Sequence, residues 1–468
     1  MDSETAATTH EILKRLNGLR ELDPPTHGGR VLSYVYDPGI AGLDELITGA
    51  TTAFLPVNGL DPTTFGSVAV LERDIIAFAR QLTNGDEDVV GSVTSGGTES
   101  CLLAVKSARE VWRAAHGEAG APTLVAPTTA HAAFHKGCEY FGLTMSAVDV
   151  DPETGTVPAG ALLARVDDLI AAGNPPALVV LSAPNYPIGT IDDVETIAPA
   201  MAERGIPVHV DACVGGFVLP FYPQEPPAWD FRVRGVRSIS LDAHKYGYAP
   251  KGASVVLYRG REHHQAQYFA CVEWPGYPVV NPTMLGSRSA TALAAAWAVI
   301  NRLGIAGYRN AVERIAGATD HLTRTLAGLP GLRIVGEPFG PLIAVTSEPG
   351  PDAVDPFNFI DALKDRGFLA QAQPAFGNLP RSAHLTLTPV TADVIDDLTA
   401  AITAAAEAVR GKPAPRGNLG IVKQIAAQGL PEDLAEVMAT LEALPPEVAP
   451  GALVQVLAGL IDPEGALP

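Results

Sequence analysis

Short unbroken hydrophobic runs alternate with helical patterns through the central part of the chain. Residues 177–181 (ALVVL) and 206–210 (IPVHV) are runs of this kind, and such runs are typical of parallel strands that are covered on both faces. The apolar residues of 99–115 instead recur at helical spacing, at Leu102, Val105, Ala108 and Trp112. This alternation predicts an α/β fold with a mainly parallel sheet, flanked by helices and joined by right-handed crossovers.

Changes in the pattern divide the chain into four expected parts. They are an N-terminal arm, a large α/β domain, a small C-terminal α+β domain and a helical tail, at 1–58, 59–307, 308–412 and 413–468. Helices are expected near 11–22, 304–326, 358–366, 391–410, 432–444 and 452–461, and strands near 123–126, 238–241, 332–335, 342–345 and 384–387. The apolar run 290–300 is too short to span a bilayer and predicts a buried helix.

Composition and charge narrow the class of protein. The chain has 468 residues, which is enough to bury a large core, and its net charge of −20 leaves little basic surface for nucleic-acid phosphates. Its four cysteines form no CxxC pair, which suits a reducing compartment and offers no metal-site spacing. Because a basic-then-apolar signal is also missing, we expect a cytoplasmic protein that binds no nucleic acid or metal and spans no membrane.

Polar residues end the two predicted strands named above, Ser182 after 177–181 and Asp211 after 206–210. Ligands of parallel sheets bind beyond the carboxyl ends of the strands, so we expect the functional site at this edge. Asp211 is either a cap or turn residue or a buried carboxylate that pairs with a bound group. The following Gly215-Gly216 would let the backbone pass close to that group.

Lys245 lies in the segment 238–252 (SISLDAHKYGYAPKG), directly after a predicted strand. A single lysine is normally exposed, but this one lies between a strand and an aromatic, glycine-containing loop. A buried lysine has a lowered pKa, and the neutral amine is the form that attacks an aldehyde. We therefore expect Lys245 to be a reactive amine.

Two more features of the sequence are candidates for a binding site, a predicted anion site at 95–98 and the imidazole of His131. Residues 95–98 (SGGT) open the predicted helix 99–115, and backbone N–H groups at a helix N-terminus bind phosphate. A plain glycine turn is the alternative, but we favour phosphate binding with Thr98 as the helix cap. His131, after the predicted strand 123–126, is either a hydrogen-bonded core histidine or a ring that stacks on a cofactor.

An amine, a carboxylate, a glycine-rich turn and an imidazole are together what a protein needs to hold pyridoxal 5′-phosphate. Lys245 would condense with the aldehyde of this cofactor, and Asp211 would keep its pyridine nitrogen protonated. His244, which precedes Lys245, would donate to its phosphate.

These residues lie in segments that resemble the pyridoxal-phosphate-dependent sphingosine-1-phosphate lyases, relatives of the group II amino-acid decarboxylases with the aspartate-aminotransferase fold (fold type I). The similarity extends from about residue 30 to about residue 426. It is carried by 29–31, 93–100, 131–134, 183–191, 209–217, 230–257 and 286–288. The segment 244–252 (HKYGYAPKG) is the most specific, because the wider decarboxylases share its His-Lys pair but usually not the residues that follow.

The resemblance implies a cofactor site that two subunits share. Its residues would be Gly97, Thr98, His131, Asp211, His244, Lys245 and, from the second subunit of a homodimer, Ser287. Lys245 would carry the covalent bond, Asp211 would face the pyridine nitrogen, and His131 would stack on the ring. On the substrate side, Tyr186 would lie near the reacting carbons.

The resemblance also implies that Tyr36 and Lys251 bind the substrate, Lys251 through a phosphate. Asp61 departs from the family pattern, because the lyases usually have a phosphate-binding histidine where this chain reads NGLDP at 58–62. A lost hydrogen bond and like-charge contact would weaken phosphate binding by about tenfold or more. Either Asp61 points away, or another basic group compensates, or the substrate is not a long-chain base phosphate and Asp61 receives an amine or hydroxyl.

The implied reaction is retro-aldol cleavage of a phosphorylated 2-amino-3-hydroxy compound to an aldehyde and an amine such as phosphoethanolamine. The first alternative is a pyridoxal-dependent amino-acid decarboxylase, in which Arg288 would bind the carboxylate unless its role is structural. The second is a protein of this fold that binds a partner without catalysis. The joint presence of Lys245, Asp211 and His131 argues against the second.

Overall fold

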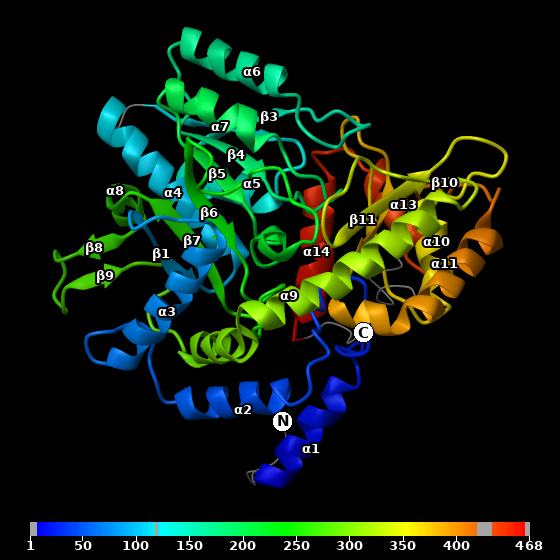
Figure 1. The fold of residues 1–468 in the computed structure, drawn as a ribbon, viewed down its shortest axis with the longest axis horizontal. Coiled ribbons are helices and arrows are strands. Elements are labelled where there is room, and N and C mark those ends of the chain that lie inside the picture. Colours follow the sequence, from blue (N-terminus) through cyan, green and yellow to red (C-terminus); the bar gives the residue numbers. More distant parts are fainter. Residues whose placement is uncertain (1–6, 118–119, 419–432, 464–468) are drawn as a thin grey trace.

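The computed structural model describes residues 7–117, 120–418 and 433–463. A seven-stranded sheet forms the centre of the larger part, in the order β1-β7-β6-β5-β4-β2-β3 (Figure 1). Its strands are β1 (Val89–Thr94), β2 (Thr123–Pro127), β3 (Thr144–Val148), β4 (Leu178–Ser182), β5 (Val208–Asp211), β6 (Val236–Leu241) and β7 (Ser254–Arg259). Only β7 runs antiparallel to its neighbours β1 and β6, so the prediction of a mainly parallel sheet is confirmed.

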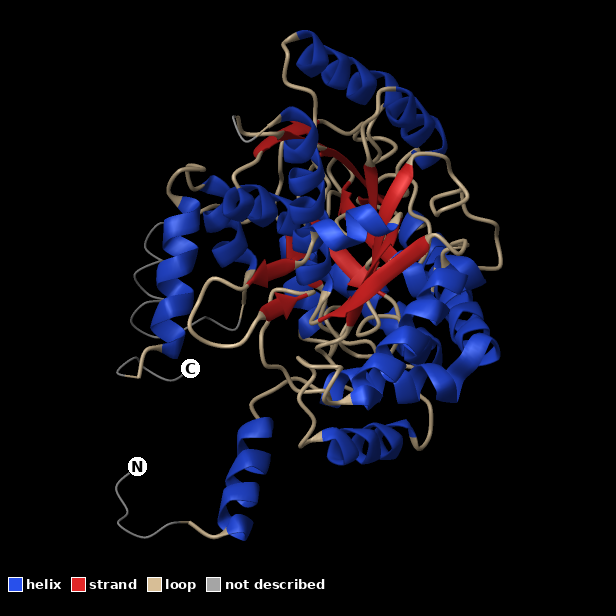
Figure 2. Cartoon of the chain, turned by 90° about the vertical axis from the view of Figure 1, so that its left-hand side faces the viewer, coloured by secondary structure: helices blue, strands red, loops and turns tan. Residues whose placement is uncertain are grey.

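Successive residues of the central strands pack into different layers, which explains why these strands read as unbroken apolar runs. Leu124 and Leu178 belong to a core cluster that also contains residues of the helices α4 (Gly97–His116) and α5 (Ala132–Phe141). Their neighbours Val125 and Val179 belong to a second cluster, with residues of four other helices, α3 (Gly66–Leu82), α6 (Ala159–Ala171), α7 (Val194–Glu203) and α9 (Thr291–Ala327). Helices therefore cover both faces of the sheet, which Figure 2 shows from the side.

The helices of this part flank the sheet or cross its edge. They are α3 (Gly66–Leu82), α4 (Gly97–His116), α5 (Ala132–Phe141), α6 (Ala159–Ala171), α7 (Val194–Glu203), α8 (Arg261–Ala266) and α9 (Thr291–Ala327). The helix expected from 290–300 and the one expected near 304–326 are both parts of α9, interrupted by the non-helical Gly304. A short hairpin of β8 (Phe269–Cys271) and β9 (Val279–Asn281) forms a separate two-stranded sheet that projects from the edge of the larger part (Figure 1).

A second, antiparallel sheet forms the smaller part with its own core. Its order is β10-β11-β13-β12. The elements are β10 (Leu332–Ile334), β11 (Leu342–Ser347), β12 (Gln371–Gln373), β13 (Ser382–Thr386), α10 (Pro356–Lys364) and α11 (Ile395–Val409). The helix expected from 391 begins later, because Thr388 and Thr391 form a capping box around a 3-10 turn that precedes α11.

The ends of the chain are helical. Near the N-terminus, α1 (Thr9–Arg20) is exposed throughout and extends away from the body, whereas α2 (Leu43–Phe54) packs along α9 (Figures 1 and 2). Near the C-terminus, α13 (Ala435–Ala443) packs on α10 and is followed by α14 (Ala449–Ile461). The expected helix start at 432 and the end of the family similarity near 426 lie outside the described residues. The four domain limits stay predictions.

None of the helices in the described ranges has the length and apolarity required to cross a bilayer.

Candidate active site

The carboxyl ends of β4, β5 and β6 and the N-terminus of α4 surround a cavity of about 370 Å³. Ser182 and Asp211 are the last residues of β4 and β5, where the sequence placed them. The cavity brings together seven of the predicted site residues, namely Gly97, Thr98, His131, Tyr186, Asp211, His244 and Lys245. The prediction that a site forms at this edge of the sheet therefore agrees with the geometry.

Lys245 lies in the turn after β6 and forms an ion pair with a carboxylate that the sequence reasoning did not single out. Its Nζ is 3.0 Å from Oδ2 of Asp242. Asp242 is buried, and its Oδ1 accepts a hydrogen bond of 2.5 Å from Ser254 Oγ. Burial acts to lower the pKa of Lys245, but the charge of Asp242 outweighs burial and raises this pKa well above its ordinary value. The expectation of a lowered pKa is wrong for this reason.

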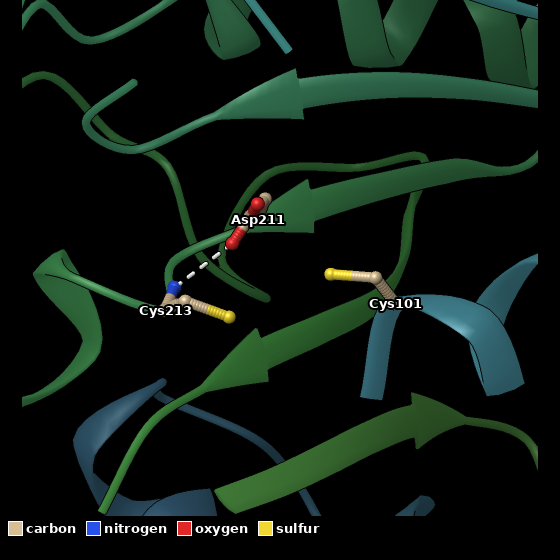
Figure 3. A group of neighbouring side chains, drawn as sticks. All are labelled: Cys101, Asp211 and Cys213. Carbon is tan, nitrogen blue, oxygen red and sulfur yellow. Dashed lines mark hydrogen bonds between the residues drawn. The ribbon is translucent and has the colours of Figure 1, made fainter. Parts of the chain in front are cut away.

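Asp211 lines the cavity, and the sulfur atoms of Cys101 and Cys213 lie near its carboxylate (Figure 3). Its Oδ1 accepts a hydrogen bond of 3.0 Å from the backbone N–H of Cys213. The ligand atoms of Asp211, Cys213 and Cys101 lie within 4.8 Å of one another. The hydrogen bond with Cys101 and burial raise the pKa of Cys213 well above its ordinary value. A protonated thiol is a poor metal ligand, and all three residues line the cavity.

The glycines after Asp211 have a different role from the one expected. A Cβ on Gly215 would lie 2.1 Å from the carbonyl oxygen of Ala183, and one on Gly216 would lie 2.4 Å from Cβ of Leu241. Both glycines therefore let the chain after β5 pack against its neighbours, and neither faces the cavity.

The N-terminus of α4 forms one wall of the cavity. The helix starts at Gly97 after the N-cap Gly96, and no side chain caps its first N–H groups. The expected cap at Thr98 is wrong, because Thr98 is already the second residue of the helix. A Cβ on Gly97 would lie 2.7 Å from Oδ2 of Asp242, so glycine is required where the helix approaches this carboxylate. Uncapped N–H groups and the helix dipole attract an anion.

His131 is the N-cap residue of α5, where its Nδ1 accepts a hydrogen bond of 3.1 Å from the N–H of Ala133. Its side chain is exposed and lines the cavity. The alternative of a histidine hydrogen-bonded within the core is therefore wrong, and the imidazole is available to a bound ring.

Tyr186 connects the two parts of the fold at the site. Its hydroxyl donates to Oε1 of Gln371 in β12 at 2.5 Å, and its ring centre is 4.4 Å from that of His384 in β13. Burial raises the pKa of Tyr186, so the hydroxyl stays protonated at neutral pH. Sequence reasoning missed Gln371 and His384, because both come from short strands more than 180 residues away and no local pattern marks them.

Tyr36 and Lys251 lie next to the cavity. Nζ of Lys251 is 4.5 Å from the centre of the Tyr36 ring and donates to the carbonyl of His244 at 2.9 Å. Burial and the charge of Lys245 lower the pKa of Lys251 to about 8, so Lys251 is mostly charged at pH 7. No ion pair joins it to a carboxylate of the described part of the chain.

Asp61 and Ser287 do not reach this cavity and line a separate one of about 990 Å³. Asp61 accepts hydrogen bonds from the hydroxyls of Thr63 (2.6 Å) and Thr64 (2.7 Å) and from the N–H groups of both. These bonds lower the pKa of Asp61 to about 2. Of the three explanations for Asp61, the structure supports the first, that Asp61 points away from the active site of its own chain. Its carboxylate oxygens are hydrogen-bonded to Thr63 and Thr64 instead.

Comparison with known proteins identifies the family. Residues 68–346 match the pyridoxal-dependent decarboxylase conserved domain. The sphingosine-1-phosphate lyase of Saccharomyces cerevisiae is 32% identical, with 93% of this chain and 73% of that protein covered. This chain belongs to the sphingosine-1-phosphate lyase family.

Another lyase and a solved structure support the assignment. The family member from Drosophila melanogaster is 37% identical over 76% of this chain, which spans only 62% of the length of that relative. The structure of the sphingosine-1-phosphate lyase of Burkholderia pseudomallei matches with a TM-score of 0.80 and 30% identity, over 87% of this chain and 93% of that one. The expected fold type and family are therefore confirmed.

Pyridoxal 5′-phosphate is the cofactor of this family, and the cavity fits it. The uncapped N-terminus of α4 offers N–H groups to a phosphate. Nδ1 of His244 is buried and has no hydrogen-bond partner within the described residues, so a bound phosphate would supply the partner that such an atom needs. Asp211 offers a carboxylate to the pyridine nitrogen, and Lys245 offers an amine to the aldehyde. These individual roles stay predictions.

The pairing of Lys245 with Asp242 leads to a testable expectation. Replacing Asp242 with asparagine removes the charge that raises the pKa of Lys245, by about 1–3 pH units for a close carboxylate. A larger neutral fraction of the amine then attacks the cofactor. At pH 8 we expect cofactor-free Asp242→Asn to bind pyridoxal phosphate covalently about tenfold faster than the parent chain, as measured by stopped-flow absorbance.

Asp230→Asn is the matched control, because Asp230 is a buried carboxylate paired with Arg232. Equal rates of attachment in all three proteins would contradict the account of the Lys245 pKa.

Proposed function

We propose that this chain cleaves the C2–C3 bond of a phosphorylated 2-amino-3-hydroxy compound, and releases an aldehyde and phosphoethanolamine. The observation that carries the proposal is the ammonium of Lys251, which has no carboxylate partner among the described residues and lies near the amine of Lys245, in a chain of this family. The names of the related lyases support a long-chain base phosphate as the substrate class.

Lys251 and Tyr36 would bind the substrate phosphate. The Lys251 ammonium already lies against the Tyr36 ring. Burial raises the pKa of Tyr36, so its hydroxyl remains a hydrogen-bond donor at neutral pH. A charged donor and a neutral donor side by side suit a phosphate group. Lys251 would also supply the basic group that compensates for the aspartate at position 61.

The bound cofactor would supply an electron sink for the breaking C2–C3 bond. Asp211 would hold the positive pyridine nitrogen, and His131 would stack on the ring and orient it. Once the substrate amine has displaced it, Lys245 would accept the proton of the 3-hydroxyl, be held as an ammonium by Asp242, and return that proton to C2. Tyr186, protonated and half-buried, would donate a hydrogen bond near the 3-oxygen. The proton lost from the 3-hydroxyl balances the proton gained at C2.

None of the described residues that line the cavity of Lys245 is an arginine that could bind a substrate carboxylate, which weighs against the decarboxylase alternative. The guanidinium of Arg288 donates to the carbonyls of Gly59 (3.2 Å) and Val93 (3.3 Å) and to the hydroxyl of Thr283 (3.1 Å). These bonds engage the guanidinium and give Arg288 a structural role.

A second copy of the chain would complete the site. Ser287 lies outside the cavity of Lys245, so its contact with the cofactor phosphate requires a neighbouring subunit. Large apolar side chains are exposed on the β8–β9 hairpin and the segment after it, namely Phe269, Trp274, Tyr277, Met284 and Leu285. A surface of this kind is typical of a protein interface, and two-fold pairs are the commonest assemblies.

The dimer is tested by sedimentation of the purified chain at micromolar concentration. We expect a dimer, and we expect Ser287→Ala to bind pyridoxal phosphate more weakly without changing the sedimentation rate. An active monomer would overturn the proposed role of Ser287.

The reaction is tested by its products. The purified chain, loaded with pyridoxal phosphate, should convert sphingosine 1-phosphate to an aldehyde and phosphoethanolamine and release no carbon dioxide from a panel of amino acids. Carbon dioxide without aldehyde would rule out the lyase proposal.

Lys251→Ala separates substrate binding from cofactor binding. We expect the KM for the phosphorylated substrate to rise by about tenfold or more, because a hydrogen bond to a charged group is lost, while the absorbance of the bound cofactor is unchanged. Arg302→Ala provides a matched control, because Arg302 is an exposed cation on α9.

A further inference from the structure

A second cavity, also of about 370 Å³, adjoins the cofactor cavity. The two cavities share His131 and Tyr186 in their walls. The second one lies between the two parts of the fold, because segments 128–132 and 186–188 contribute one side and β12 with the segment 374–380 contributes the other. A ligand group attached to the reacting carbons near Tyr186 can therefore extend into it.

The wall of this second cavity contains no aspartate, glutamate, lysine or arginine among the described residues. Ile188 and Val335 are fully buried apolar side chains in it, and Phe376 and Leu379 add apolar surface. The two glutamines are already engaged: Gln371 accepts from Tyr186, and Gln373 donates to the carbonyl of Pro187 at 2.8 Å. The hydroxyls of Thr128 and Thr129 also line the cavity and have no hydrogen-bond partner among the described residues. A wall of apolar side chains and neutral polar groups, with no charged carboxylate, amine or guanidinium, suits an uncharged ligand group better than an ionised one.

The outer wall is a short hairpin that the rest of the protein holds in place. The N–H of Phe376 donates to the carbonyl of Leu379 (3.1 Å), and the N–H of Leu379 donates back (3.0 Å). At the tip, Nδ2 of Asn378 donates to the carbonyl of Val150 at 2.6 Å, which ties the hairpin to the larger part of the fold. Phe376 nevertheless remains 63% exposed at this wall, although a large aromatic side chain gains free energy when it is covered.

We infer that this cavity binds the hydrocarbon chain that is attached to C3 of the substrate. The inference rests on the proposed function, and it assigns the two ends of the substrate to different groups. The phosphate end lies at Tyr36 and Lys251, which line neither cavity, and the chain passes Tyr186 into the uncharged cavity. Since a water-sized group occupies about 30 Å³, the cavity has room for about a dozen such groups, and a longer chain reaches Phe376.

A series of 2-amino-3-hydroxyalkyl phosphates of increasing length tests this inference. Each methylene that enters the cavity should raise kcat/KM about threefold to fourfold, until the cavity is full and the values level off. Binding of simple alkyl phosphates, which cannot react, should show the same dependence by titration calorimetry. A dissociation constant and a kcat/KM that are both independent of chain length would overturn the inference.

Phe376→Ser and Tyr140→Ser provide a matched pair of variants, because both remove an exposed aromatic side chain and Tyr140 lines neither cavity. Phe376→Ser should lower kcat/KM for the longest substrate by about tenfold, and Tyr140→Ser should leave it unchanged. Equal values for the two variants, with equal melting temperatures, would contradict the role of Phe376.

The two proposals can fail separately. If aldehyde is released but chain length has no effect on rate or binding, the cleavage reaction stands and the cavity assignment fails. If no aldehyde is released while alkyl phosphates still bind more tightly with length, the cavity assignment stands and the cleavage reaction fails.

Discussion

The buried carboxylate of Asp242 is the interaction on which the arrangement of the site depends. A charge taken out of water must be paired and hydrogen-bonded, and removing one partner of such a pair costs about 3–5 kcal/mol. The hydroxyl of Ser254 and the ammonium of Lys245 meet this need, and the glycine at position 97 allows α4 to approach. The same carboxylate thus fixes the amine of Lys245, sets its charge and lies next to the uncapped N-terminus of α4.

The placement of the site between the two parts of the fold gives it two chemically different sides. Lys251 and Tyr36 form a cationic, donor-rich side, whereas the cavity behind Tyr186 is uncharged. The bond from Tyr186 to Gln371 holds this boundary in place. A substrate with a phosphate at one end and an apolar chain at the other matches both sides, which a small charged amino acid does not.

The large sheet and most of the site could be predicted from the sequence, because both depend on local patterns. Buried parallel strands read as apolar runs, and Asp211 followed one of them. The charge state of Lys245 could not be predicted, although Asp242 lies only three residues before it, because a pKa depends on which groups are buried together. The antiparallel β7 and the partners of Tyr186 were also missed, since strand direction and contacts between distant segments leave no periodic signal.

Covalent attachment of pyridoxal phosphate to Lys245 is the central requirement of the proposed reaction. Borohydride reduction of the loaded protein, followed by peptide mass mapping, measures this attachment. We expect the reduced adduct on the peptide that contains Lys245, with the same result for a Lys251→Ala variant. Fully loaded protein in which that peptide carries no adduct would contradict this expectation.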